Sequence, residues 1–386
     1  MPAMRLSWDI FCSVIDNFGD IGVCWRLARQ LADERAEPVR LWVDDLAAFA
    51  QLERRLDATR DEQDLDGVYI QRWQAPFPAV QPQAVVIEAF ACNPPADFLA
   101  AMAAQRPPPV WINLEYLSAE AWVEGCHALG SRHPRLPLTH HFFFPGFTAK
   151  TGGLLREADL LAARDVFQTH QGAQQQWLSA LGLDAQEQTL PRVSLFCYDN
   201  PVLAELLAHW SRAQPLCLLV ADGKPRRAVA EWLGEDFPPG SHVQRGQLRL
   251  IALPFLPQSD YDRLLWSCQL NFVRGEDSFV RAQWAARPMV WHIYPQEEDA
   301  HLIKLDAFLA RYTEGLSTAD EALVQGFWQA WNRGDGEACV RGWPALWQAQ
   351  ARLAEHARRW SDELAQAPDL MQALAAFASE KRQAAG

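Results

Sequence analysis

The chain has 386 residues, 49% hydrophobic and 22% charged, which is enough apolar material for one large domain or two ordinary ones and excludes a disordered chain. Its 48 acidic residues outnumber 35 basic ones, and the net charge of −13 disfavours binding to nucleic acid or to an anionic membrane surface. No segment approaches the roughly 20 apolar residues of a membrane span, and the N-terminus lacks the pattern of a secretory signal.

The eight cysteines are scattered singly, mostly inside apolar runs, and none forms a C-x-x-C pair. A disulfide framework or a zinc site would need cysteines at closer and more regular spacing. The pattern predicts reduced, buried thiols and therefore a cytoplasmic protein.

The first part of the chain alternates between strand-like and helix-like segments. A β-rich run at residues 6–15 precedes a turn-like segment, and apolar residues at helical spacing follow over 21–31. Continuous apolar strands between helices are typical of a parallel sheet. The same reasoning predicts strands at 39–43, 68–73, 84–90 and 110–114, and helices at 46–56 and 95–104.

A looser stretch, rich in proline, glycine and glutamine, runs from about residue 118 to 188 and predicts a linker or an insertion. A second alternating series follows it, and from residue 299 onward the pattern is almost entirely helical, with breaks near 334–336 and at Pro368. The second series predicts strands at 193–198, 216–220, 248–253, 270–273 and 289–293, and helices at 203–210, 261–268 and 279–286.

These two series predict an α/β protein with two Rossmann-like domains facing a cleft. We expect the N-terminal domain at residues 1–188 and the C-terminal domain at 189–364, with a last helix at about 365–386 that packs back on the first domain. The same alternation suits sugar-nucleotide transferases, dehydrogenases and kinases, so fold alone does not decide the function.

Two carboxylates, Asp16 and Asp20, flank the first strand-to-helix turn, where open α/β sheets place their ligands. One alternative is purely structural: Asp20 caps the helix and Asp16 closes an Asx turn. Capping needs only one carboxylate, however, and a second one would repel a phosphate at this loop. We therefore expect the loop to meet a cation.

The segment from Arg274 to Trp284 joins a strand end, a glycine turn and a helix start. Gly275 permits close backbone approach, and Asp277 or Ser278 can serve as the N-cap. The N–H groups of such a helix start would suit a diphosphate. The alternative is an ordinary capped helix with acidic residues in its first turn, and Arg274 and Glu276 favour the binding hypothesis over it.

Aromatic residues follow two strands of the second series. Phe196 and Tyr198 end the first strand, and Phe255 and Gln258 follow a later one, where a ring can stack on a base and an amide can read its edge. Core packing is the alternative for these aromatics. We assign to packing the tryptophans at helical spacing, namely Trp177, Trp210, Trp266, Trp328 and Trp331.

Several common signatures are missing. The first turn lacks G-x-G-x-x-G, although Asp44 and Asp45 end the next strand about where a ribose-binding acid would lie. The carboxylates of Asp64 and Asp66 resemble a metal-binding pair but lie in an acidic run that predicts a solvated loop. The sequence shows no clustered metal ligands, nucleophile elbow, Walker loop or kinase signature, so no metal or cofactor is expected.

The run Asp16-Asn17-Phe18-Gly19-Asp20-Ile21-Gly22-Val23-Cys24-Trp25-Arg26-Leu27-Ala28, together with the Arg274 to Trp284 block, resembles the EarP family of bacterial protein-arginine rhamnosyltransferases. The similarity extends over the whole chain. It implies an inverting, metal-independent glycosyltransferase of the GT-B class, with an N-terminal acceptor-binding domain and a C-terminal nucleotide-sugar-binding domain. The implied reaction moves rhamnose from dTDP-β-L-rhamnose to an arginine of translation elongation factor P (EF-P), which supports translation of polyproline stretches.

The resemblance also implies roles for the residues found above. Asp20 becomes the candidate general base, Asp16 a partner in the same site, and Glu276 a further essential carboxylate. By the chemistry of the leaving group, helix N–H groups near Ser278 and the side chain of Arg274 or Arg281 can stabilise the negative charge on the departing dTDP. The donor-binding residues implied are Asp277, Ser278 and Phe279 for the diphosphate and Phe196, Tyr198, Phe255 and Gln258 for the thymidine.

Three other functions stay open at this point. One is a GT-B transferase with another nucleotide sugar or acceptor, and another is an NAD-dependent oxidoreductase, which the missing glycine fingerprint disfavours. The last is an adaptor that binds the elongation factor without turnover.

Overall fold

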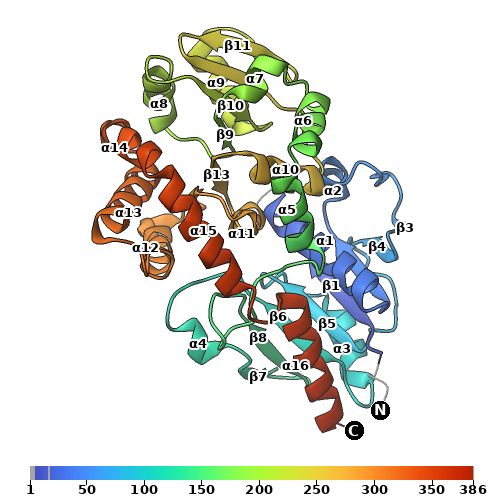
Figure 1. Cartoon of the computed structure of the whole chain (residues 1–386). Helices are drawn as coiled ribbons and strands as arrows, with labels where there is room; N and C mark the ends of the chain where they lie inside the picture. The colour runs from blue at the N-terminus through green and yellow to red at the C-terminus, as the bar shows by residue number, and fades with distance from the viewer. Residues whose placement is uncertain (1–4, 16–17, 386) are drawn as a thin grey trace. The chain divides into compact units, whose positions relative to one another are not determined.

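The structure is a computed structural model that describes residues 5–15 and 18–385 (Figure 1). It divides into two compact units, one made of residues 1–158 and 364–386 and the other of residues 159–363. The boundary therefore lies at Asp159 rather than at residue 189, because the helices after residue 159 pack on the second sheet. The C-terminal segment groups with the first unit.

The first unit is built on an eight-stranded sheet with strand order β3-β4-β2-β1-β5-β6-β8-β7. Its six inner strands are parallel, whereas β3 and β7 pair antiparallel at the two edges. The parallel strands, taken in chain order, follow the 3-2-1-4-5-6 order of a Rossmann fold. The strands are β1 (Trp8–Cys12), β2 (Val39–Val43), β3 (Glu62–Leu65), β4 (Val68–Arg72), β5 (Val85–Ala89), β6 (Val110–Leu114), β7 (Gly130–Arg132) and β8 (Thr139–Phe143).

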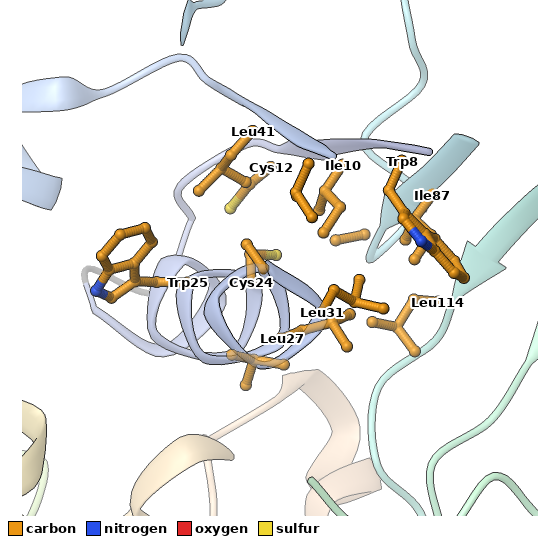
Figure 2. Packing of buried hydrophobic residues seen from close by; sticks show 14 of the residues in the cluster. Trp8, Ile10, Cys12, Cys24, Trp25, Leu27, Leu31, Leu41, Ile87 and Leu114 are labelled. Carbon is orange, nitrogen blue, oxygen red and sulfur yellow. The ribbon is translucent and has the colours of Figure 1, made fainter. Parts of the chain in front are cut away.

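Helices cover this sheet on both faces. Helix α1 (Gly19–Glu34) places apolar side chains at helical spacing, and Figure 2 shows Cys24 and Leu31 beside Ile10 and Cys12 of β1. The last helix contacts α1 and β6 and joins the same core. The remaining helices of the unit are α2 (Leu46–Leu52), α3 (Ala96–Ala104), α4 (Val123–Cys126) and α16 (Leu370–Ala385).

The second unit is built on a six-stranded sheet with order β11-β12-β10-β9-β13-β14. All neighbouring strands are parallel except β11 and β12, so the parallel strands again follow the order 3-2-1-4-5. The two Rossmann-like units predicted from the sequence are thus confirmed. The strands are β9 (Arg192–Leu195), β10 (Leu216–Val220), β11 (His242–Arg245), β12 (Leu248–Ala252), β13 (Leu270–Arg274) and β14 (Met289–His292).

The helices of the second unit include those that precede its sheet in the chain. Trp210, Trp328 and Trp331 are almost fully buried and Trp266 is buried, in accordance with the packing role predicted for them. The helices are α5 (Leu160–Thr169), α6 (Gln171–Ala180), α7 (Ala185–Thr189), α8 (Val202–Trp210), α9 (Lys224–Leu233), α10 (Gln258–Ser267), α11 (Asp277–Ala285), η1 (Glu297–Asp299), α12 (Ala300–Tyr312), α13 (Thr318–Arg333), α14 (Gly336–Gln348) and α15 (Gln350–Leu364).

The interpretation of residues 118–188 as a linker or insertion was wrong. This stretch contains β8, which pairs parallel with β6, and helices α5 to α7 of the second unit. Strand β8 has a weak signal in the sequence because His140 and His141 interrupt its apolar pattern. Asp64 and Asp66 are exposed, as predicted, but they lie in a β-hairpin rather than in a loop. Asp64 is in β3 and Asp66 is in the turn before β4, where its two oxygens bind Arg55 at 2.8 Å.

All eight cysteines are free thiols, and six of them are buried. Burial raises the pKa of Cys197 to about 12 and that of Cys268 to about 11, so these thiols stay protonated. In the described part of the chain, no helix combines the length and the apolar character that a membrane span requires.

Candidate functional site

Each sheet has one point where the strand order reverses, and in open α/β sheets ligands bind outside the carboxyl ends of the strands at this point. In the first unit the reversal lies between β1 and β5, and in the second it lies between β9 and β13. The segments that follow these four strands carry most of the residues singled out from the sequence.

Asp20 lies in the first turn of α1, directly after β1 and its loop. Its side chain is 3% exposed, and its Oδ2 accepts a hydrogen bond of 2.9 Å from the backbone N–H of Ile15. The other oxygen accepts a bond of 3.3 Å from the hydroxyl of Tyr116, which follows β6. The structural alternative in which Asp20 caps this helix was wrong, because Asp20 lies inside α1 and the N-cap residue is Phe18, which makes no side-chain capping bond. Asp16 lies outside the described residues.

Tyr116 was not found by sequence analysis. Its ring stacks on that of Phe90 at 4.3 Å between centroids and 15° between planes. Phe90 follows β5 and has a φ of 58°, in the left-handed region that residues other than glycine rarely adopt. Tyr116 follows the carboxyl end of β6, and this position in the sequence could have identified it as a site residue.

The ribose-binding role considered for Asp44 and Asp45 was wrong. Asp44 accepts hydrogen bonds from the Ser13 hydroxyl at 2.5 Å and from the backbone N–H of Val14 at 2.9 Å, so it holds the loop after β1. Asp45 caps α2 by accepting a bond from the N–H of Ala48. Both carboxylates thus serve local structure.

In the second unit, Arg274 ends β13 and lies against two aromatic rings of the neighbouring strand end. Its guanidinium carbon is 4.4 Å from the ring centroid of Phe196 and 4.7 Å from that of Tyr198. Such cation–π contacts hold a planar cation in place without using all of its N–H donors. The structure therefore brings together three of the predicted donor-binding residues.

Helix α11 begins at Asp277, directly after a turn in which Gly275 has a φ of 60°. Ser278 closes this turn: its hydroxyl donates to the backbone oxygen of Arg274 and accepts from the Arg274 N–H at 3.1 Å. The N-cap is Glu276, not Asp277 or Ser278 as expected. The first turn of α11 consequently presents its backbone N–H groups at the carboxyl edge of the sheet, where they suit an anion.

The side chains of Phe279 and Arg281 point into the protein rather than toward a ligand. Phe279 is fully buried and stacks on Trp291 at 3.8 Å, so only its backbone can contact a phosphate. Arg281 is 2% exposed and binds both oxygens of Asp262 at 2.8 and 2.7 Å. The role considered for Arg281 in stabilising dTDP was therefore wrong.

Gln258 is the first residue of α10 and is buried, and Phe255 is half-buried in the preceding loop. Tyr261, which lies on the same face of α10 as Gln258, contacts the ring of Phe196 at 5.8 Å. The start of α10 therefore lies beside the cluster formed by Phe196, Tyr198 and Arg274.

Three further residues surround Tyr198 and were missed in the sequence. His292 contacts its ring at 5.3 Å and Tyr294 at 5.4 Å, and the Lys224 ammonium lies 5.8 Å from the ring centroid. Burial, reinforced by the charge of Arg274, lowers the pKa of His292 to about 3, so this imidazole is neutral. All three lie at or just after strand ends of the second sheet, and this position could have identified them in the sequence as site residues.

Comparison with known proteins agrees with this arrangement. The family model described as "Elongation-Factor P (EF-P) rhamnosyltransferase EarP" matches residues 8–379. The protein-arginine rhamnosyltransferase of Pseudomonas putida (strain KT2440) is 52% identical over 376 residues, which cover 97% of this chain and 99% of the relative. The chain belongs to the EarP family.

More distant members are similar over the same extent. The protein-arginine rhamnosyltransferase of Shewanella oneidensis is 41% identical, covering 96% of this chain and 97% of the relative. A solved structure described as the "structural basis for EarP-mediated arginine glycosylation of translation elongation factor EF-P" is 40% identical, with a TM-score of 0.69 and coverage of 97% of this chain and 98% of that one. The two Rossmann-like units are those of the GT-B glycosyltransferase fold.

Proposed function

We propose that this protein is an inverting, metal-independent glycosyltransferase that moves rhamnose from dTDP-β-L-rhamnose to an arginine side chain of EF-P. The modified factor would support translation of polyproline stretches. Membership of the EarP family supports the reaction and the acceptor. Free, mostly buried cysteines support a cytoplasmic location, because reduced thiols persist there.

One observation carries the proposal: each unit places chemically matched residues at its own strand-order reversal. The first unit places a buried carboxylate, Asp20, after β1. The second places Arg274 and two aromatic rings at the ends of β9 and β13, with the start of α11 next to them. A carboxylate suits a guanidinium acceptor, whereas rings, a cation and helix N–H groups suit a nucleoside diphosphate.

The acceptor chemistry demands carboxylates. A guanidinium has a pKa near 13, so removing its proton in advance at pH 7 costs about 8 kcal/mol. We therefore propose that proton loss accompanies attack on an oxocarbenium-like sugar carbon. In this scheme Asp20 takes the proton and Asp16 helps to orient the planar fork and to balance its charge. Glu276 is proposed as a further carboxylate that transfer requires.

The departing dTDP gathers negative charge. We propose that the backbone N–H groups of Asp277, Ser278 and Phe279 and the guanidinium of Arg274 stabilise the diphosphate. The thymidine would lie among Phe196, Tyr198, Phe255 and Gln258. The backbone N–H groups and the guanidinium supply a fixed positive potential at the diphosphate, which is the contribution that a metal ion makes in other transferases.

The test is intact-mass spectrometry of EF-P after incubation with this protein and dTDP-rhamnose. We expect the elongation factor to gain the mass of one deoxyhexose on one arginine. An EF-P variant with lysine at that arginine serves as the control and should gain none. Unchanged EF-P mass, or equal transfer from a UDP-sugar, would refute the proposal.

A further inference from the structure

The first unit contains a second binding feature that the reaction scheme above leaves unused. It is a pocket of about 500 Å³ at the carboxyl edge of the sheet, which we call the edge pocket. Segments that follow β2 and β4 and the segment that begins α3 build its walls. Its lining residues are Asp44, Trp73, Gln74, Ala75, Pro76, Phe77, Pro95, Ala96 and Asp97.

The edge pocket shares a loop with the candidate base. Asp44, on its rim, binds the backbone N–H of Val14 at 2.9 Å, and Asp20 binds the N–H of the next residue, Ile15, at 2.9 Å. Consecutive residues are only about 3.8 Å apart between Cα atoms. Asp44 and Asp20 therefore hold neighbouring residues of the same loop.

The lining has the chemistry of a site for an organic cation. Asp97 is an exposed carboxylate, and Asp44, whose two oxygens hold the loop after β1, adds a second negative charge at the rim. Every other lining residue is uncharged. Arg72, the nearest basic residue along the chain, is engaged with Asp61 at 2.7 Å and with the carbonyl oxygen of Ala58 at 2.6 Å. A phosphate or carboxylate ligand would be repelled here, whereas a guanidinium or ammonium would be attracted.

The two aromatic residues of the edge pocket, Trp73 and Phe77, pack against residues of the sheet. Trp73 packs edge-on against Phe11 of β1 at 5.3 Å, and Phe77 packs against Trp42 of β2 at 4.7 Å. Both rings pack against the buried cluster that contains Phe11 and Trp42, and each ring is only partly buried. Rigid rings with carboxylates at the rim favour the stacking of a planar cation, because little ordering is needed on binding.

We propose that the edge pocket binds a second basic side chain, arginine or lysine, of the acceptor protein while the target arginine lies at Asp20. This inference rests on the function proposed above and adds a recognition site to it. The second contact would restrict transfer to an arginine in the correct protein context, since a free arginine cannot occupy both places.

The test variant is Asp97→Lys, which reverses the charge at an exposed position in the first turn of α3. We expect the KM for EF-P to rise about tenfold at low ionic strength, with an unchanged dissociation constant for dTDP-rhamnose. Asp97→Asn should give a smaller rise of about two- to fivefold, because it removes the attraction without adding repulsion. Asp33→Lys, the same exchange at an exposed position of α1, is the matched control and should change neither constant.

The partner residue is found by substituting the basic residues of EF-P one at a time with glutamate. We expect one such variant to be a poor acceptor for the wild-type enzyme and to recover at least half of the lost affinity with Asp97→Lys. An unchanged KM for Asp97→Lys, or the failure of every EF-P variant to recover affinity, overturns the edge pocket proposal while the proposed function stands. Absence of transfer by the wild-type enzyme would instead refute the proposed function.

Discussion

At the scale of single residues, Asp20 is oriented by one donor from the loop that precedes α1 and by one from a distant part of the chain. The N–H of Ile15 fixes one carboxylate oxygen and the hydroxyl of Tyr116 contacts the other. A buried carboxylate with defined partners can present a lone pair in one direction, which a general base requires. The same contacts make Asp20 and Tyr116 separately testable.

We expect Asp20→Asn to lower kcat by at least about a hundredfold, because asparagine keeps the shape of the side chain but cannot take a proton. Binding of dTDP-rhamnose should be retained. Intact-mass kinetics on EF-P and calorimetric titration of the donor measure the two effects, with Asp33→Asn on the exposed end of α1 as the control. Full activity of Asp20→Asn would remove it as the base.

We expect Tyr116→Phe to lower kcat two- to tenfold, the equivalent of one hydrogen bond of about 0.5–1.5 kcal/mol. The ring stacking on Phe90 is kept, so thermal stability should change little. Tyr69→Phe is the matched control, since the Tyr69 hydroxyl binds Glu62 on the edge strand β3. A kcat equal to that of the wild type would show that the Tyr116 hydroxyl does not position Asp20.

At the scale of elements, the position of helix α11 decides where the proposed diphosphate contacts lie. The buried pair of Asp262 and Arg281 ties α11 to α10, the helix that begins at Gln258. Arg164 of α5 adds a bond of 2.9 Å to the carbonyl oxygen of Trp284 near the other end of α11. Polar contacts thus hold both the middle and the end of α11.

We expect Arg281→Met to destabilise the second unit by about 3–5 kcal/mol, because it leaves the buried Asp262 carboxylate without its cation. Urea unfolding measures the loss. The double variant Asp262→Leu with Arg281→Met is the informative control, since it removes both charges and should recover most of the stability. If the double variant is as unstable as the single one, the pair contributes through packing rather than through charge.

At the scale of the whole molecule, folding stability depends on pH through buried carboxylates. Glu88 of β5 is 4% exposed, and burial, with the charge of Glu115, raises its pKa to about 7. His140 lies 3.9 Å from it, and burial lowers the pKa of that imidazole, so it adds no positive charge at neutral pH. The folded state therefore holds a proton on Glu88 that the unfolded chain releases near pH 4.5.

This shift costs stability as the pH rises. Between about pH 4.5 and 7 the folded state binds more protons than the unfolded state, so the free energy of unfolding falls across this window and levels off above it. We expect Glu88→Gln to stabilise the protein at pH 8 by up to about 3 kcal/mol and to have little effect at pH 5.

Urea unfolding of Glu88→Gln and the wild type at pH 5 and pH 8 measures this difference. The matched control is Glu380→Gln at an exposed position of α16 in the same unit, for which the effect should be the same at both pH values. An equal effect of Glu88→Gln at pH 5 and pH 8 would contradict the assignment.

The sequence alone determined the elements whose own residues carry the signal. Buried parallel strands appear as continuous apolar runs, so β2 and β10 were predicted with their observed bounds, Val39–Val43 and Leu216–Val220. The turns at Asp20 and at Gly275 were recognised because they follow such strands. Edge strands β3 and β11 were missed, since one or both of their faces are polar.

Tertiary structure alone decided which of these side chains are available for chemistry. Arg281 was a candidate ligand for phosphate, but its guanidinium binds Asp262 of another helix. Asp44 was considered as a ribose ligand, but its carboxylate accepts hydrogen bonds from Ser13 and Val14. Hydrogen-bond partners and the walls of the edge pocket come from segments that are distant in the chain. The local sequence pattern determines the backbone conformation of each element. The packing of elements against one another determines which polar side chains already have hydrogen-bond partners and which remain able to bind a ligand.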